Sequence, residues 1–431
     1  MRNPPIVPKL FVENRARLQT QLLPRSLVVV NANDIPPTNA DGTRRLTQNS
    51  DLFYLTGVNQ EESILVLFPD ADDEKHRELL FLRETSELIA IWEGHKLTRE
   101  EAQQRTGIRR VHWLSEFPAI FRRLMCEAGH VYLNTNEHKR AVTEVESRDQ
   151  RFIHAVQRQY PLHSYQRLAP LMHRLRVVKS EPEIELLRQA CHLTGKGIQR
   201  LLHWVKPGVT ETEVEAELAH EFIRGGGDFA YPPIIASGAN ACVLHYLEND
   251  QPCRKGDLLL LDVAASYGNY NSDLTRTLPV SGRFTRRQRQ VYEAVLRVLR
   301  AEIAGLKPGR KWKDWQQDAE QLIERECVNL GLLSLRDIRR QDPERPAVRR
   351  YFMHGVGHPI GLDVHDVGLL SDPFQAGWVM TVEPAIYVPA EGLAVRLENT
   401  VVIRENGVED LMSDIPLEAD EIEAALQSRR R

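Results

Sequence analysis

Carboxylates at the ends of buried apolar strands constrain this chain more than any other feature of its sequence. Leu258–Leu261 is a fully apolar run that predicts a buried strand, and Asp262 follows it directly. A second strand is expected over Asp273–Val280, after the turn signal Tyr267-Gly268-Asn269. If the turn is centred near Gly268, Asp262 and Asp273 lie opposite each other, where like charges repel. Because a buried carboxylate is costly unless it is paired or metal-bound, we expect a cation between them.

The same pattern recurs further along the chain. Trp378–Val388 and Leu393–Ile403 predict two strands joined by a turn at residues 389–392. Folding about this turn brings Glu383 opposite Glu398. A slip of one residue would turn one partner to the other face. Two facing pairs within one candidate domain nevertheless argue against an accident of register.

Three of the fifteen histidines, His354, His358 and His365, fall within twelve residues of each other. The spacing of His354 and His358 would suit a helix face, but three glycines and a proline among them predict a loop or irregular strand. Four carboxylates and one imidazole are a hard, oxygen-rich ligand set that suits divalent Mn, Co, Fe or Zn. Four carboxylates exceed the charge that one ion needs, so two ions about 3.5–4 Å apart are expected.

The first third of the chain predicts a mixed α/β domain. Strands are expected at Ser26–Asn31, Ile64–Phe68 and Glu78–Leu82, and helices at Thr98–Arg105 and Leu114–Glu127. Such alternation is typical of a small sheet covered by helices.

A length of 431 residues predicts two domains or three. Ser180-Glu181-Pro182-Glu183 is typical of a helix start, and a long helix is expected over Ile184–Val205. We therefore expect an α/β (α+β) protein with domains at residues 1–172 and 173–431.

The second domain contains a weak internal repeat. A helix runs into Lys206-Pro207-Gly208 and another follows over Glu211–Arg224; a helix also runs into Lys307-Pro308-Gly309, with a further helix over Lys313–Glu326. Two such units suggest a duplicated half-domain. The alternative is that Lys-Pro-Gly is simply a common helix stop.

Composition excludes several classes of protein. Lys and Arg number 56 against 60 Asp and Glu, which gives no support to nucleic-acid binding through a basic surface. No apolar run approaches the ~18–20 residues of a membrane helix, so no membrane is expected as a partner. Five cysteines, with no pair at CxxC spacing, argue against a disulfide framework or a thiolate zinc site. Since no secretory signal is recognised, a reducing cytoplasm is the expected compartment.

At the residues above, the sequence resembles the family of Xaa-Pro aminopeptidase (aminopeptidase P), whose creatinase/aminopeptidase fold is called pita-bread. The family's metal ligands are Asp, Asp, His, Glu and Glu in that order, and they match Asp262, Asp273, His358, Glu383 and Glu398. The surrounding motifs HGVGHPIGLDVHDVG, TVEPAIY and VRLENTVVI match too. Ser50–Gly57 resembles the N-terminal domain of aminopeptidase P and prolidase. The resemblance implies a pita-bread catalytic domain with pseudo-twofold halves, preceded by a smaller α/β creatinase-like domain.

The resemblance also implies two divalent ions, Mn²⁺ first, with Co²⁺, Zn²⁺ or Fe²⁺ as alternatives. Asp262 would chelate one ion, His358 and Glu383 the other, and Asp273 and Glu398 would bridge both. A metal-bridging hydroxide would attack the carbonyl before a proline at the second position, and Glu383 is also a candidate proton shuttle.

Further site residues follow from the same resemblance. His245 matches a family histidine that lines the substrate site. His354 and His365 match the two that hold the substrate and stabilise the tetrahedral intermediate. Arg396 matches an arginine that orders this network. The alternatives are that Arg396 is only a charge partner for buried carboxylates and that His245 is a core residue.

Trp92 resembles an N-domain tryptophan that can complete a neighbour's substrate site in bacterial oligomers. We therefore expect a substrate-binding role and a homo-oligomer, dimer or tetramer. The alternative is an ordinary packed tryptophan.

Some positions depart from the family pattern. Gly357 precedes His358 where many aminopeptidases P carry Ser, Pro359 follows it, and Glu398-Asn399 replaces a frequent Glu-Asp. Gly-His-Pro is also seen in prolidases, so this motif does not separate the two activities. His245–Asn249 and the tail at Asp420–Leu426 favour aminopeptidase P.

The leading hypothesis is thus a dinuclear metallo-aminopeptidase that removes an N-terminal residue ahead of proline. Prolidase, which splits Xaa-Pro dipeptides, is the main alternative. Methionine aminopeptidase shares the ligands but usually lacks so large an N-terminal domain. A non-enzymatic binding module or a metal-free amidinohydrolase like creatinase would be expected to have lost ligands.

Overall fold

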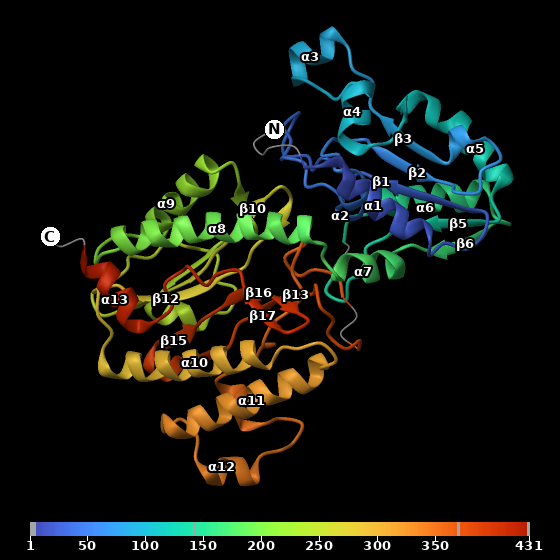
Figure 1. Cartoon of the computed structure of the whole chain (residues 1–431). Helices are drawn as coiled ribbons and strands as arrows, with labels where there is room; N and C mark the ends of the chain where they lie inside the picture. The colour runs from blue at the N-terminus through green and yellow to red at the C-terminus, as the bar shows by residue number, and fades with distance from the viewer. Residues whose placement is uncertain (1–5, 142–143, 369–370, 429–431) are drawn as a thin grey trace. The chain divides into compact units, whose positions relative to one another are not determined.

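The chain forms two compact units, Pro4–Arg176 and Val177–Arg431 (Figure 1). The computed structural model describes residues 6–141, 144–368 and 371–428. The boundary expected at residues 172–173 lies inside the helix α7, Ala169–Val177. Within the described residues, no helix combines the length and apolar content that a membrane span requires.

A six-stranded mixed sheet with the order β4-β3-β2-β1-β5-β6 is the centre of the N-terminal unit. The expected strands at Ser26–Asn31 and Glu78–Leu82 are confirmed, and the third is one residue shorter than expected. All six residues of β1 are buried, which explains the apolar run over the middle of that segment, Leu27–Val30. The strands are β1 (Ser26–Asn31), β2 (Ile64–Leu67), β3 (Glu78–Leu82), β4 (Arg110–Trp113), β5 (His130–Leu133) and β6 (Ser164–Arg167).

Helices on this sheet begin at recognisable caps. Thr98 caps α4, where its side chain and that of Glu101 form a reciprocal capping box. The helix expected over Leu114–Glu127 is a short 3-10 turn, η2, followed by an α-helix. Besides α7, the helices are α1 (Pro8–Gln19), α2 (Ser50–Thr56), η1 (Glu74–His76), α3 (Glu87–Glu93), α4 (Arg99–Thr106), η2 (Leu114–Glu116), α5 (Phe117–Glu127) and α6 (Arg148–Gln159).

The C-terminal unit places short strands between two layers of helices. In Figure 1, α8 and α9 lie on one side of the strands and α10 and α11 on the other. The helices are α8 (Glu181–Trp204), α9 (Glu211–Arg224), η3 (Gly238–Cys242), α10 (Arg286–Gly305), α11 (Trp312–Asn329), α12 (Leu335–Arg340), η4 (Ala347–Arg350), η5 (Pro389–Glu391) and α13 (Ala419–Ser428). The strands are β7 (Asp228–Phe229), β8 (Ile234–Ser237), β9 (Leu258–Asp262), β10 (Ala265–Tyr267), β11 (Tyr270–Asn271), β12 (Thr275–Pro279), β13 (Val379–Val382), β14 (Ala385–Val388), β15 (Leu393–Arg396), β16 (Asn399–Arg404) and β17 (Gly407–Asp410).

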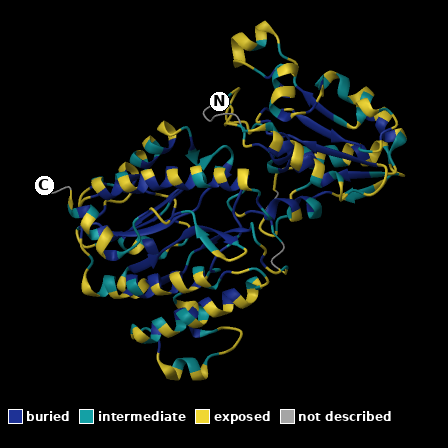
Figure 2. Ribbon diagram, in the orientation of Figure 1, coloured by how far each residue is buried: buried dark blue, intermediate teal, exposed yellow. Residues whose placement is uncertain are grey.

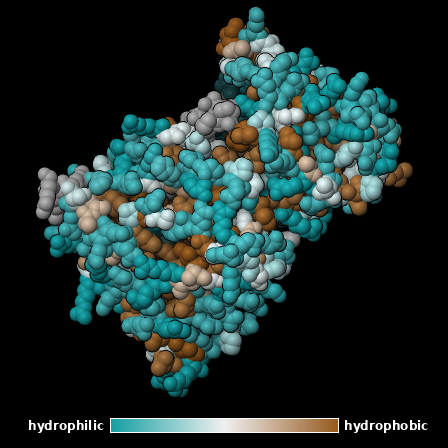
Figure 3. Space-filling view, viewed as in Figure 1, coloured by the Kyte–Doolittle hydropathy of each residue, from teal (hydrophilic) through white to brown (hydrophobic). Residues whose placement is uncertain are grey.

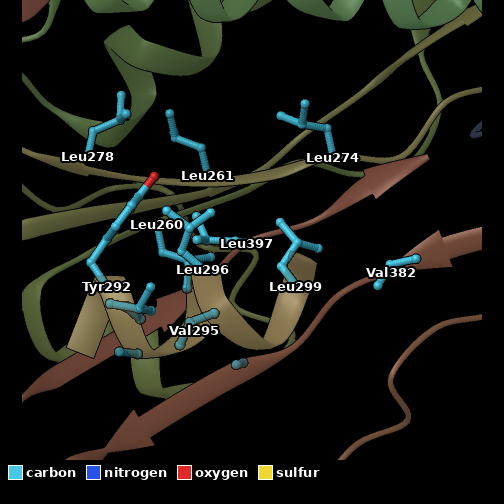
Figure 4. Packing of buried hydrophobic residues seen from close by; sticks show 14 of the residues in the cluster. Leu260, Leu261, Leu274, Leu278, Tyr292, Val295, Leu296, Leu299, Val382 and Leu397 are labelled. Atoms are coloured by element: carbon cyan, nitrogen blue, oxygen red, sulfur yellow. The ribbon is translucent and has the colours of Figure 1, made fainter. Parts of the chain in front are cut away.

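One continuous apolar core fills the C-terminal unit. Successive residues of β9 point to opposite sides, so that Leu260 points toward the side on which Leu296 and Leu299 of α10 lie, while Leu261 points the other way (Figure 4). Most of the strands are buried, except for β7 and β17, and the outer faces of the helices are exposed (Figure 2). In Figure 3, apolar side chains reach the surface in a recess between α8 and α10.

The two Lys-Pro-Gly segments adopt matching structures. Gly208 follows α8 with φ +98°, and Gly309 follows α10 with φ +85°. The amide of Gly208 donates to the Cys253 carbonyl and that of Gly309 to the Phe374 carbonyl. Two residues beyond each glycine the chain forms an isolated antiparallel bridge with a proline: Thr210 pairs with Pro252, and Lys311 pairs with Pro373. Repeated geometry of this kind supports the expected duplication over the simple helix-stop alternative.

Candidate functional site

The first carboxylate hairpin has a register that differs from the expected one. Gly268 and Asn269 form its turn, both with positive φ, as a tight hairpin turn requires. Asp262 pairs with Thr275, so the expected pairing of Asp262 with Asp273 is wrong. The turn is centred later than expected, which moves Asp273 two residues along the ladder. Because a shift of two keeps the same face, the two carboxylates are diagonal neighbours on one side of the hairpin.

The second hairpin has the expected register. Val382 pairs with Asn399 and Ala385 with Arg396. The same register continues across the break at Pro384, which cannot donate a ladder hydrogen bond. Glu383 therefore lies opposite Glu398, as the sequence predicts.

Tyr231 joins Asp262 to Asp273. Its hydroxyl lies 2.6 Å from Oδ1 of Asp262 and 2.5 Å from Oδ1 of Asp273. A hydroxyl has one proton and can donate to only one of them at a time. The other carboxylate therefore needs a proton or a cation close by.

Asp273, His358 and Glu398 come closest to forming a metal site. Each offers a ligand atom, and these atoms lie within 4.8 Å of one another. His358 Nε2 is 3.5 Å from Asp273 Oδ2 and 3.7 Å from Glu383 Oε1. Glu398 Oε2 also accepts a hydrogen bond from Thr275 Oγ1, at 2.7 Å.

Burial disfavours the ionised form of these carboxylates in the absence of a cation. It raises the pKa of Asp273, Glu383 and Glu398 well above the usual range for carboxyl groups. Neighbouring carboxylates raise the pKa further: Asp262 acts on Asp273, and Glu398 on Glu383. A divalent cation between them would remove this repulsion, so the donor set fits the metal pair expected from the sequence.

The loop that carries His358 is fixed by β13. The His358 amide donates to Thr381 Oγ1, and the Thr381 amide donates to the His358 carbonyl. His358 Nδ1 lies 2.9 Å from the Pro359 carbonyl oxygen, which can only accept a hydrogen bond. Nδ1 therefore donates to this carbonyl, and Nε2 faces the carboxylates, the orientation typical of a metal-ligating histidine.

A second network connects Arg396, Tyr387 and His354. Arg396 Nη2 donates to Asp262 Oδ2 at 2.5 Å and Nη1 to the Tyr387 hydroxyl at 2.8 Å. His354 Nε2 lies 2.9 Å from the same hydroxyl, and its Nδ1 lies 2.8 Å from the Gly355 carbonyl. Burial, assisted by the charge of Arg396, lowers the pKa of His354 to about 3. His354 is therefore a neutral imidazole at neutral pH.

The other expected site residues are more exposed. The ring of His365 packs edge-on against His358, with centroids 4.5 Å apart. His245 is exposed, so it is not a core residue, and its charge contributes to the lowered pKa of His354. Trp92 on α3 is 80% exposed, which excludes an ordinary packed tryptophan within the N-terminal unit.

Sequence reasoning missed Tyr231, Thr275 and Tyr387. Tyr231 precedes two prolines just before β8, and nothing in Phe-Ala-Tyr-Pro-Pro indicates that it meets two aspartates. Tyr387 lies four residues after Glu383 in TVEPAIY, within the segment that the sequence predicts as a single strand, so period-two alternation could have placed both on one face.

Comparisons with known proteins agree with this architecture. Residues 185–405 match the model of metallopeptidase family M24, and residues 11–132 match the aminopeptidase P N-terminal domain. The Xaa-Pro aminopeptidase of Escherichia coli is 32% identical over 98% of both chains. Human Xaa-Pro aminopeptidase 3 is 31% identical over 91% of this chain and 78% of its own length.

Solved structures match over the whole chain. A zinc-substituted aminopeptidase P of E. coli, in complex with product, has a TM-score of 0.88 at 31% identity and covers 99% of this chain and 100% of the other. An aminopeptidase of Pseudomonas aeruginosa has a TM-score of 0.88 at 30% identity and covers 100% of both. The C-terminal unit thus has the pita-bread fold, preceded by an aminopeptidase P N-terminal domain. The chain belongs to metallopeptidase family M24.

Proposed function

We propose that this chain is a metal-dependent Xaa-Pro aminopeptidase, which hydrolyses the bond between an N-terminal residue and a following proline. The observation that carries this proposal is the convergence of Asp273, His358 and Glu398, with Glu383 and Asp262 beside them, in a chain with full-length aminopeptidase P relatives. The proposed substrates are peptides with proline at the second position.

Five residues are proposed as metal ligands. Asp262 would bind one ion, His358 and Glu383 the other, and Asp273 and Glu398 both. Two such ions supply a Lewis acid for the peptide carbonyl and a water molecule of lowered pKa. We propose Mn²⁺ as the physiological metal, because carboxylate oxygens dominate the donor set.

The chain's own residues would bind the substrate and move protons. Glu383 would take a proton from the attacking water and return it to the leaving nitrogen. His245, His365 and Trp92 would contact the peptide. His354 would stabilise the developing oxyanion, for which its Nδ1–H must leave the Gly355 carbonyl and donate to the substrate. Arg396 would hold Asp262 and Tyr387 in place.

Three further expectations remain proposals. We propose a cytoplasmic location, a homo-oligomer and domains at residues 1–172 and 173–431. The five free cysteines support a reducing compartment, and the exposed Trp92 on α3 is accessible to a second copy of the chain.

Hydrolysis of Ala-Pro-Ala beside Ala-Pro tests the activity. The protein is treated with EDTA, dialysed and supplied with Mn²⁺, and products are separated by chromatography. We expect Mn²⁺-dependent release of Ala from the tripeptide with little cleavage of the dipeptide. Cleavage of the dipeptide alone would identify a prolidase, and cleavage of neither would refute the proposal.

Asp273→Ala tests the ligand assignment. If Asp273 binds both ions, the variant should lose activity and at least one metal per chain, measured by atomic emission after dialysis against Mn²⁺. The exposed Asp414→Ala is the matched control and should retain both. Two metals per chain in Asp273→Ala would refute the bridging role.

A further inference from the structure

A buried ion pair lies in the C-terminal unit outside the carboxylate cluster. Lys179 Nζ donates to Asp366 Oδ2 at 2.8 Å, and each side chain is 1% exposed. A buried ion pair is weak evidence for stability, because desolvation of two charges offsets most of their attraction. The position of this pair in the fold points to a different role.

Asp366 ends the loop that carries the two histidines of the site. The loop begins at His358, which β13 holds through Thr381. At its other end the Asp366 amide donates to the Pro359 carbonyl at 2.9 Å, which closes the loop on itself. His365 is the residue next to Asp366, so the backbone that carries the imidazole is anchored by its neighbour's side chain.

A neighbouring strand holds the middle of the same loop. Asn271 of β11 donates from its side chain to the carbonyls of Gly361 and Leu362, at 3.2 and 2.9 Å. Its amide also donates to the Gly361 carbonyl, at 2.8 Å. The loop is therefore fixed at its start, its middle and its end by three different segments of the unit.

Lys179 extends from a rigid base. Its amide donates to the Gly377 carbonyl at 2.8 Å. The next residue, Ser180, caps α8 in a capping box with Glu183, whose other carboxylate oxygen accepts a hydrogen bond from Tyr270 of β11. The ammonium group is thus tied to the start of a 24-residue helix.

Gly361 leaves room for the ion pair. A Cβ at this position would lie 2.3 Å from Asp366 Oδ2 and 2.8 Å from Lys179 Cε. Both side chains are buried, so a methyl group here would have to push the pair apart. A glycine is required at this position because the pair approaches it so closely.

We propose that the Lys179–Asp366 ion pair is a positioning device for His365. It fixes the end of the histidine loop to the start of α8, and thereby holds the imidazole next to His358 and the substrate. This inference rests on the proposed function, in which His365 contacts the peptide; Lys179 and Asp366 themselves act only through the loop.

The double variant Lys179→Met/Asp366→Ala tests the inference. It removes both charges together, because a single substitution would leave one buried charge unpaired and could unfold the unit. Arg297→Met/Glu326→Ala is the control for the loss of two charges, since it removes a more exposed ion pair of 2.7 Å between α10 and α11. Gly361→Ala disturbs the pair without removing a charge.

Hydrogen exchange measures the loop directly and needs no catalytic activity. In the double variant and in Gly361→Ala, we expect amides over residues 361–366 to exchange at least ~10-fold faster, while β13 is unchanged. The control should match the parent throughout. Exchange over residues 361–366 equal to that of the parent would overturn the inference, whatever the activity.

Kinetics separate positioning from general stability. With the full-length protein, Mn²⁺ and Ala-Pro-Ala, we expect kcat to fall about 10–100-fold in the double variant, with two metals per chain retained. In a His365→Ala background the same double substitution should change kcat less than 2-fold. An equal fall in both backgrounds, or loss of metal along with activity, would overturn the assignment to His365. If the parent cleaves neither peptide, the proposed function fails, and the exchange data still decide whether the pair holds the loop.

Discussion

Gly357 directly precedes the histidine loop, at a point where the backbone passes very close to its neighbours. A Cβ there would be 2.0 Å from the Thr381 carbonyl oxygen and 2.8 Å from the Trp315 ring. The Thr381 backbone is held in β13, and Trp315 is fully buried. Neither neighbour can move cheaply, so a residue without a Cβ is the one that fits at this position.

Gly357→Ala should therefore destabilise the C-terminal unit by about 1–3 kcal/mol. The matched control is Gly355→Ala in the same motif, where a Cβ would meet nothing closer than 3.5 Å. Urea unfolding followed by fluorescence measures both. Equal midpoints for the two variants would show that the backbone relaxes around residue 357.

Tyr231 is the residue whose role was least visible in the sequence. Its hydroxyl orients Asp262 and Asp273, and Tyr231→Phe removes that hydrogen bond while it keeps the ring. We expect the variant to fold and to bind Mn²⁺ about 10–100-fold more weakly, as groups that orient metal ligands typically do. Isothermal titration with Mn²⁺ checks this, with Tyr267→Phe, a half-buried tyrosine beside the hairpin turn, as control. Unchanged affinity would mean that the two aspartates are oriented by other partners.

The two hairpins show how far elements can be predicted from sequence. Glu383 was placed correctly because Pro389 and Gly392 mark the position of the turn in the sequence. In the structure this turn is η5, and Gly392 caps it with φ +57°. Asp273 was misplaced by two residues because the turn signal spans Tyr267-Gly268-Asn269 and does not say which two residues form the turn. A shift of two residues does not change the face on which a side chain lies, so the two carboxylates were still expected on one side of the hairpin.

Ends of helices were predicted better than connections between strands. α9 has the expected bounds, Glu211–Arg224, because Thr210 and Glu213 form a capping box and Gly225 ends the helix. Contacts such as Tyr387 with His354 join residues 33 apart in sequence, and no local pattern specifies them. The candidate metal ligands were predicted from strand ends and spacing, and the family resemblance supplied the role proposed for each, whereas the contacts that orient them needed the structure.

Gly208 and Gly309 permit a test at the scale of the repeated helix–turn–helix elements. Both have positive φ, and a Cβ at either would meet nothing within 4 Å. Gly208→Ala and Gly309→Ala should each cost about 1–2 kcal/mol, entirely from the backbone conformation. The exposed neighbours Lys206→Ala and Lys307→Ala should change stability by less than ~0.5 kcal/mol. A larger cost at only one glycine would argue that the two turns are not equivalent.

At the scale of the whole molecule, burial brings the pKa of a carboxyl group close to neutrality in both units. Burial raises the pKa of Asp149 in the N-terminal unit to about 7, although Asn31 donates to it. Burial also raises the pKa of Glu302 in the C-terminal unit to about 7, against the opposing charge of Arg310. Glu302 Oε2 finds no hydrogen-bond partner among the described residues.

These raised pKa values make stability fall as pH rises. Below pH 4.5 Glu302 is protonated in both the folded and the unfolded state, so it does not lower the free energy of unfolding. Between pH 4.5 and 7 the unfolded state releases the proton while the folded state keeps it, and the free energy of unfolding decreases. Above pH 7 the loss is complete, at most about 3 kcal/mol. The same sign holds for Asp149.

Glu302→Gln should remove this loss from the C-terminal unit alone. Urea unfolding at pH 5 and pH 8, with Mn²⁺ saturating so that the site carboxylates do not contribute, should show a smaller pH dependence than in the parent. Asp149→Asn is the reciprocal control, because it should flatten only the transition of the N-terminal unit. Two separate transitions are expected, since each unit has its own core. If Glu302→Gln leaves the pH dependence unchanged, the carboxyl group is ionised in the folded state and water or a rearranged Arg310 must neutralise it.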